Sequence, residues 1–194
     1  MKIDPVVYVN GEWIQQSRAK ISLLDAGFLY GDGLFETIRF QHRKLFRPEQ
    51  HISRLRDGLS VLNLKLDIPD GTIIQLLTRT ISENTMDHGL LRLIITRGVV
   101  LDKPWDVSSD PSVYILPRPL SPTPIEPVKI VWLQESQFPL IRFQPAIKSV
   151  NYLGNMLAKR EAENDGAFEP VFVDNDGFIT EGAIRNIFFI RDNT

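Results

Sequence analysis

The sequence predicts an α+β protein of two domains, the first a mostly antiparallel sheet that carries two helices. Short apolar runs of strand length alternate there with two longer segments whose apolar residues recur at helical spacing. Five prolines then fall within the eleven residues 117–127, where they disfavour a helix or a central strand. We therefore expect a first domain over 1–117, a stiff linker over 118–127 and a second domain over 128–194. A proline-rich surface loop inside a single domain is the alternative.

The strands and helices of the first domain follow from local patterns. Asn10-Gly11 lies between two apolar runs, which is the signature of a β-hairpin with a tight turn. Pro48 fits the first turn of a helix, and a helical repeat of apolar residues follows it. A second helix is predicted over 73–81. The remaining strands are predicted at 34–40, 90–96 and 112–116.

The second domain is predicted to alternate between strand and helix. A helix over 151–165 separates strands at 128–133 and 168–173, and a turn at 174–177 leads into a short return strand at 178–180. Residues 186–190 are expected to begin a further strand. A domain of about 70 residues that stops within a sheet would leave strand faces and an edge uncovered, so we expect this domain to be incomplete.

Composition excludes several classes of function. A hydrophobic content of 43%, a charged content of 24% and a net charge of −2 indicate no surface for nucleic acid or a membrane. No run approaches the roughly 20 apolar residues that cross a bilayer, and the first five residues do not suit a signal peptide. The absence of cysteine excludes disulfides and thiolate metal ligands and fits a cytoplasmic protein. The three histidines have no close pair of carboxylates around them, so no metal site is expected.

Two motifs near the C-terminus carry the chemistry when they are read together. They are KSVNYL at 148–153 and EGAIRNIF at 181–188, with 33 positions between the lysine and the glutamate. They resemble the two C-terminal signatures of the class-IV (fold-type IV) pyridoxal-phosphate enzymes. This family includes branched-chain and D-amino-acid aminotransferases, certain amine transaminases and 4-amino-4-deoxychorismate lyases. Upstream, GDGLFE at 31–36 and HISRL at 51–55 resemble its two N-terminal motifs, so the resemblance covers essentially the whole chain in the right order.

The resemblance implies a pyridoxal 5′-phosphate site and a role in it for five residues. Lys148 would form a Schiff base with the cofactor aldehyde and then move a proton to or from the substrate. Glu181 would face the ring nitrogen, which must stay protonated if the cofactor is to accept electrons. Arg54 would bind the phosphate with its planar fork, and Tyr152 would donate to the ring oxygen. Asn186 would support the site from just beyond the glutamate.

Read one at a time, these residues have ordinary structural explanations. They could be a solvated lysine, a turn carboxylate, an ion-paired arginine on a helix surface and a core aromatic. Their occurrence together, in the order of the family motifs, favours the cofactor site.

The candidate substrate-binding residues are Phe35, Arg39, Arg92 and Arg97, although each arginine could be structural instead. D-amino-acid aminotransferases hold the substrate carboxylate with an arginine and a histidine shortly after a Thr-Arg-Gly stretch. This chain has the stretch at 96–98 but neither residue after it, so D-amino-acid transamination ranks lower. Thr37 stands where branched-chain enzymes usually have glycine, and threonine at this position is common among lyase-like members of the family. Tyr152, in contrast, favours transamination.

We therefore expect a pyridoxal-phosphate-dependent aminotransferase that moves an amino group between a branched-chain-like amino acid and a 2-oxo acid. Two alternatives stay open: a 4-amino-4-deoxychorismate lyase that releases pyruvate, and a non-catalytic truncated relative. The resemblance also implies a homodimer, a barrel-like α/β second domain and a cofactor in the cleft between the domains.

Overall fold

A computed structural model of the chain describes residues 4–101, 103, 105 and 110–191. They form two compact units: the first contains Met1–Ser121 and Phe143–Val150, and the second contains Pro122–Arg142 and Asn151–Thr194. The chain therefore passes from one unit to the other three times. The expected boundaries, 1–117, 118–127 and 128–194, did not include the return of residues 143–150 to the first unit.

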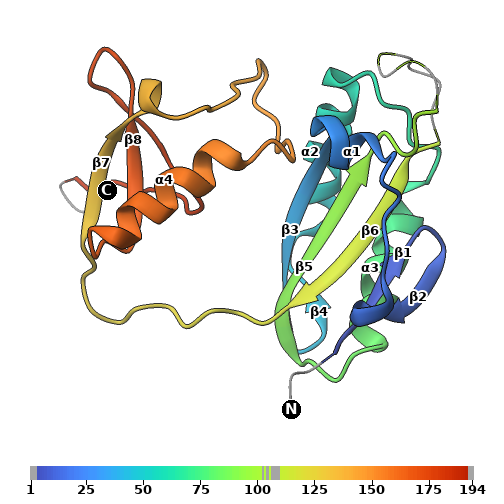
Figure 1. Ribbon diagram of the computed structural model, residues 1–194. Coiled ribbons are helices and arrows are strands. Elements are labelled where there is room, and N and C mark those ends of the chain that lie inside the picture. The colour runs from blue at the N-terminus through green and yellow to red at the C-terminus, as the bar shows by residue number, and fades with distance from the viewer. Residues whose placement is uncertain (1–3, 102, 104, 106–109, 192–194) are drawn as a thin grey trace. The chain divides into compact units, whose positions relative to one another are not determined.

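The first unit is built on a six-stranded sheet with the order β2-β1-β6-β5-β3-β4 (Figure 1). All neighbouring strands in it are antiparallel, as the sequence predicts. The bounds are Val6–Val9 for β1, Glu12–Gln15 for β2, Gly33–Gln41 for β3, Lys44–Leu45 for β4, His88–Thr96 for β5 and Ser112–Arg118 for β6.

The β1–β2 hairpin is confirmed by its turn. Asn10 and Gly11 have φ values of 45° and 104°, the positive values that a two-residue hairpin turn of this kind requires. Strand β6 extends further than expected and includes Pro117. It pairs with β1 only at Tyr114 and Ile115, so Pro117 has a neighbouring strand, β5, on one side only. Proline is tolerated at such an edge position, because no second strand needs its missing N–H.

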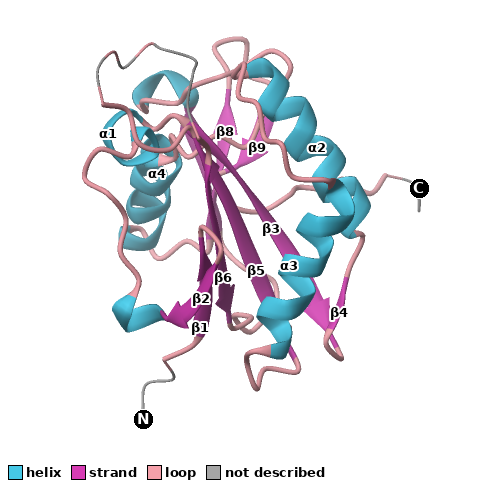
Figure 2. Cartoon of the chain, turned by 90° about the vertical axis from the view of Figure 1, so that its right-hand side faces the viewer, coloured by secondary structure: helices cyan, strands magenta, loops and turns pink. Residues whose placement is uncertain are grey.

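Two helices, α2 (Pro48–Val61) and α3 (Asp70–Ser82), cover one face of this sheet (Figure 2). Both were predicted from helical spacing of apolar residues, and most of those residues are buried. The core between helices and sheet includes Ile52, Leu55, Leu59, Ile73, Leu77, Ile81, Ile38, Leu91, Leu93, Ile95 and Ile115. Side chains alternate along a strand, so Phe35, Thr37 and Arg39 of β3 lie on the opposite face from the helices.

A short helix, α1 (Ala26–Tyr30), was not predicted, because five residues are too few to show a helical repeat. Its N-terminus is capped by the buried Asp25, whose Oδ1 accepts from the backbone N–H of Gly27 at 2.8 Å. The other oxygen of Asp25 accepts from the hydroxyls of Thr96 and Tyr114 at 2.9 and 3.0 Å. One carboxylate therefore ties the helix to the ends of β5 and β6. A 3₁₀ turn, η1 (Gln16–Arg18), precedes it.

Within the segment 143–150, residues 148–150 pair with the start of β3 as a short antiparallel addition to the sheet. Leu34 and Ser149 form an isolated bridge. The backbone N–H of Phe35 donates to the carbonyl of Lys148 at 2.8 Å, and that of Val150 donates to the carbonyl of Gly33 at 3.0 Å. These bonds fix the register of Lys148 on the first unit.

The second unit is a three-stranded sheet, β7-β8-β9, with one helix, α4, packed on it. Figure 1 labels β7, β8 and α4, and Figure 2 labels β9. Strands β7 and β8 are parallel, whereas β8 and β9 are antiparallel. Its core contains Leu133, Ala158, Phe172 and Ala183. The bounds are Ile130–Gln134 for β7, Glu135–Gln137 for the 3₁₀ turn η2, Leu153–Asn164 for α4, Glu169–Val173 for β8 and Ile179–Gly182 for β9.

The strand predicted at 186–190 is wrong, since residues 183–191 lie in no helix or strand. Phe188 and Ile190 are 85% and 82% exposed. A strand is held by hydrogen bonds to a neighbouring strand, and none within the described residues pairs with this segment. Its apolar composition alone therefore does not make it a strand.

Candidate functional site

Lys148 lies opposite the buried Phe35 on the sheet face that the helices leave open. Its Nζ is 5.6 Å from the centroid of the Phe35 ring, and Cζ of Arg92 is 3.9 Å from the same centroid. Both separations are within the range of cation–π attraction. The structure thus gathers three of the sequence-predicted residues, Lys148, Phe35 and Arg92, on one face.

A cavity of about 340 Å³ opens on the same face of the first unit. Ile94, which pairs with Phe35 across β3 and β5, is part of its wall. Val150, two residues after Lys148, is another part, and most of the remaining lining is apolar. Its polar lining residues include Asp25 and Lys20. An apolar group could therefore be accommodated near the lysine-bearing strand segment.

The other two predicted substrate residues are placed differently. Arg39 is exposed near the end of β3, with Nη2 3.5 Å from Oε1 of Gln41. Arg97 is only 6% exposed, and its Nε lies 2.5 Å from Oδ2 of Asp32. The same guanidinium donates to the carbonyl of Leu62 at 2.8 Å. These contacts tie the end of β5 to the end of α2 and favour a structural role for Arg97.

Arg54 forms a bidentate ion pair with Glu36, a residue that the sequence did not single out as part of the site. Arg54 Nε and Nη2 lie 2.6 and 2.7 Å from the two oxygens of Glu36. Nδ1 of His51, one turn earlier on α2, is 2.8 Å from Oε2 of the same carboxylate. Alternation along β3 places Glu36 on the helix face, where these side chains meet it.

The burial of this pair is asymmetric. The Glu36 side chain is 1% exposed, whereas that of Arg54 is 48% exposed. The pair uses two of the five N–H groups of the guanidinium, so donors remain on its exposed side. An anion could bind Arg54 there while Glu36 holds the arginine in place.

The pKa of Glu36 lies below its ordinary value of 4.5. Burial is the largest influence and would raise the pKa, but hydrogen bonds and Coulomb attraction from Arg54 and His51 together outweigh it. The hydrogen bond to Glu36 in turn raises the pKa of Arg54. Both groups are therefore charged at neutral pH.

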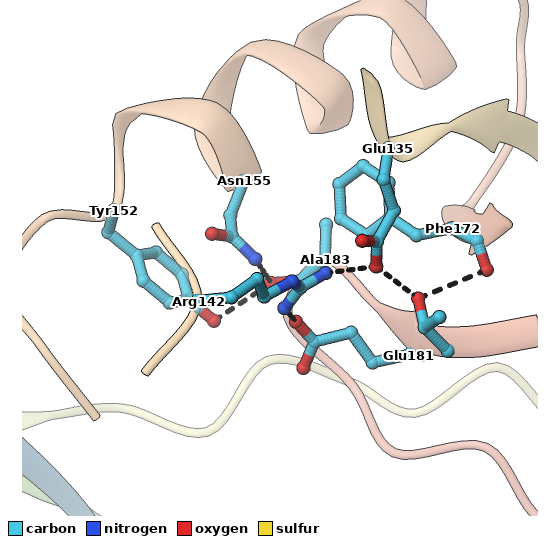
Figure 3. A network of polar contacts seen from close by, with 8 residues as sticks. Glu135, Arg142, Tyr152, Asn155, Phe172, Glu181 and Ala183 are labelled. Atoms are coloured by element: carbon cyan, nitrogen blue, oxygen red, sulfur yellow. Dashed lines mark hydrogen bonds and ion pairs between the residues drawn. The ribbon is translucent and has the colours of Figure 1, made fainter. Parts of the chain in front are cut away.

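Glu181 belongs to a polar network in the second unit (Figure 3). Oε1 of Glu181 accepts from Nη1 of Arg142, and Nη2 of Arg142 donates to Oε1 of Glu135. The hydroxyl of Thr180 donates to the same oxygen of Glu135. Oε2 of Glu181 accepts no hydrogen bond from the described part of the chain, and the side chain is 46% exposed. One carboxylate oxygen is therefore available to a ligand.

The Tyr152 side chain forms a hydrogen bond with the backbone two residues after Glu181. Its hydroxyl donates to the carbonyl of Ala183 at 2.8 Å, and Nδ2 of Asn155 donates to the same carbonyl at 3.0 Å (Figure 3). A hydroxyl has one hydrogen, so in this arrangement Tyr152 does not donate to a ligand. Asn155 was not singled out from the sequence, although it is the third residue of the helix that follows Tyr152, α4.

Asn186 is exposed and forms no hydrogen bond with other described residues. The loop before it is held by the buried Glu169, which accepts from the backbone N–H groups of Ile184 and Arg185 at 2.7 and 3.0 Å. Nη1 of Arg185 adds an ion pair to Glu169 at 2.6 Å. The loop after β9 is therefore fixed without Asn186.

Within the part of the chain that the structure describes, no cluster of three or more metal-binding side chains occurs. No helix among those residues is both long and apolar enough to cross a membrane.

The chain matches known proteins along nearly its whole length. The family model described as amino-transferase class IV matches residues 33–194. A Methanocaldococcus jannaschii protein, assigned provisionally as a branched-chain-amino-acid aminotransferase, is 32% identical over 193 residues, which cover 96% of this chain and 65% of that protein. The aminodeoxychorismate lyase of Bacillus subtilis is 33% identical over 190 residues, 95% of this chain and 64% of that protein.

A similar fold occurs in the branched-chain amino acid aminotransferase of Escherichia coli. The TM-score is 0.84 at 23% identity, over 98% of this chain and 66% of that one. At this identity the likeness concerns the fold alone. The chain spans slightly under two thirds of the length of the curated relatives, 65% and 64% for the two above.

Proposed function

Because the chain belongs to the class-IV aminotransferase family, we propose that it works as a pyridoxal-phosphate-dependent aminotransferase in which Lys148 binds the cofactor covalently. The amino group moves between an amino acid and a 2-oxo acid. The observation that carries the proposal is the placement of Lys148 opposite Phe35, with Arg92 against the same ring. On this face an amine can condense with the aldehyde of the cofactor, and a guanidinium can bind the carboxylate of the amino acid or 2-oxo acid.

The residues of each unit fit chemical groups of pyridoxal phosphate. In the first unit, Lys148 supplies an amine for the aldehyde, and the half-exposed guanidinium of Arg54 suits the phosphate. In the second unit, Glu181 has an oxygen without a hydrogen bond among the described residues, which suits a protonated ring nitrogen. Tyr152 fits less well, because its proton is directed to the carbonyl of Ala183.

Each residue then has a definite task. When bound, pyridoxal phosphate supplies an electron sink for the negative charge that develops at the substrate Cα. The amine of Lys148 would take the proton from this carbon and pass it to C4′ of the cofactor, the carbon that carried the aldehyde. Glu181 keeps a proton on the ring nitrogen, and Arg54 binds phosphate oxygens while Glu36 fixes its orientation.

We extend the proposal to a branched-chain-like substrate. The support is the apolar cavity of about 340 Å³ on the face that carries Lys148, together with the relative assigned to branched-chain amino acids. Arg92 and Arg39 are the proposed partners of the substrate carboxylate. Arg97 is a weaker choice, because Asp32 and the carbonyl of Leu62 already engage it. Asn186 stays a predicted supporting residue, and the barrel-like second domain, the homodimer and the cytoplasmic location stay predictions.

A 4-amino-4-deoxychorismate lyase is the second candidate, supported by the relative from Bacillus subtilis at 33% identity. The two reactions differ in what happens to the 2-oxo acids. A transaminase consumes 2-oxoglutarate, whereas a lyase releases pyruvate and needs no acceptor.

A coupled assay separates these candidates. With leucine as donor, we expect the protein to convert 2-oxoglutarate to glutamate and to form no pyruvate from an aminodeoxychorismate substrate. The control reaction omits the amino acid and leaves 2-oxoglutarate unchanged. Pyruvate release without any glutamate formation would overturn the aminotransferase proposal in favour of the lyase.

A further inference from the structure

Arg142 joins two carboxylates of the second unit that are 46 positions apart in the sequence, Glu135 and Glu181. Figure 3 shows its guanidinium between them. The side chain of Glu135 is 21% exposed, while those of Arg142 and Glu181 are 43% and 46% exposed. The network is thus anchored at its more buried end, Glu135, and more open at Glu181.

The anchored end is fixed by further contacts. The hydroxyl of Thr180, the residue before Glu181, donates to Glu135 and lies 3.4 Å from the carbonyl of Phe172. Phe172 is fully buried in the core of the unit. Glu135 and Thr180 therefore connect Arg142 to the core of the unit.

Arg142 keeps its charge in this setting. Burial is the largest influence on its pKa and would lower it, but the hydrogen bonds to Glu181 and Glu135 outweigh burial and raise the pKa. A fixed cation between two carboxylates offsets their mutual repulsion. Glu181 is held through Oε1, and its Oε2 accepts no hydrogen bond from other described residues.

We propose that Arg142 is a positioning residue, which orders the side chain of Glu181 so that one oxygen stays available to the ring nitrogen of pyridoxal phosphate. This inference rests on the proposed function. A glutamate side chain that is half exposed loses rotamer freedom when it binds a ligand. Because Arg142 restricts Glu181 beforehand, less of that freedom is lost on binding.

The test is a binding titration of the cofactor-free chain with two probes. One probe is pyridoxal 5′-phosphate, and the other is 4′-deoxypyridoxine 5′-phosphate, which lacks the aldehyde and cannot attach to Lys148. We expect Arg142→Met to weaken binding of both probes roughly 10-fold, and Arg142→Lys to recover part of the loss. Arg160→Met, which removes an exposed arginine of α4, is the charge-matched control and leaves affinity unchanged.

A double-mutant cycle separates positioning from a general structural role. If Arg142 acts through Glu181, Arg142→Met has little further effect in a Glu181→Gln background. Thermal unfolding of each variant shows whether the second unit is still folded. The inference would be overturned if Arg142→Met bound the probes with wild-type affinity. It would also be overturned if Arg142→Met lowered the affinity of the Glu181→Gln variant by the same roughly 10-fold factor as that of the wild type. Failure of the wild-type chain to bind either probe would instead overturn the proposed function, and this inference with it.

Discussion

Lys148→Ala is expected to lower transaminase activity by more than about 10³-fold, because the covalent attachment and the proton transfer depend on the same amine. The variant should also lose the visible absorption of the bound cofactor. The measurement is the steady-state rate with leucine and 2-oxoglutarate, together with an absorption spectrum after reconstitution. The fold should survive, because the bridge to β3 uses backbone atoms of Lys148.

Lys44→Ala is the matched control, since Lys44 is an exposed lysine of the short strand β4. It should retain wild-type activity. Activity of Lys148→Ala within 10-fold of the wild type, with the protein folded, would contradict the assigned role.

The second large effect concerns the stability of the ion pair between Arg54 and Glu36. Arg54→Ala leaves a carboxylate that is 1% exposed without its bidentate partner, and we expect a loss of about 3–5 kcal/mol in the free energy of unfolding. Glu36→Gln leaves Arg54 free to be solvated, so the expected loss is smaller, about 2 kcal/mol. The double variant should therefore be more stable than Arg54→Ala alone.

Denaturant unfolding of the cofactor-free chain measures these differences. Lys65→Ala is the control, because its ion pair with Asp67 is exposed and should contribute less than about 1 kcal/mol. Equal losses for the two single variants, or a double variant less stable than Arg54→Ala, would show that the buried charge of Glu36 is not the cause.

The same pair predicts a dependence on pH. The pKa of Glu36 in the folded state lies below its ordinary value of 4.5. Its contribution to stability is therefore fully present above that value and is lost as the pH falls through the folded-state pKa. The stability difference between the wild type and Glu36→Gln should shrink accordingly when unfolding is repeated below pH 4.5.

Local patterns predicted most of the regular structure. The Asn10-Gly11 turn and the apolar repeats of α2 and α3 depend on residues close in sequence, and these elements occur where they were expected. Helix α1 was missed because it is short and is held by Asp25 through distant hydroxyls. The strand at 186–190 was wrong because apolar composition does not supply a pairing partner.

The candidate site was only partly predictable, because its contacts are long-range. The motifs pointed to Lys148, Arg54 and Glu181, but not to what holds them. Glu36 could have been found, since alternation along β3 places it on the face where α2 packs. Arg142 carried no local signal, because its partners Glu135 and Glu181 are 7 and 39 positions away. Nothing in the sequence showed that residues 143–150 return to the first unit.

Borohydride reduction of the reconstituted protein, followed by peptide mass spectrometry, shows whether Lys148 carries the cofactor. We expect one phosphopyridoxyl group per chain, attached to the peptide that contains Lys148. A label spread over several exposed lysines, or a single label on a different lysine, would contradict it.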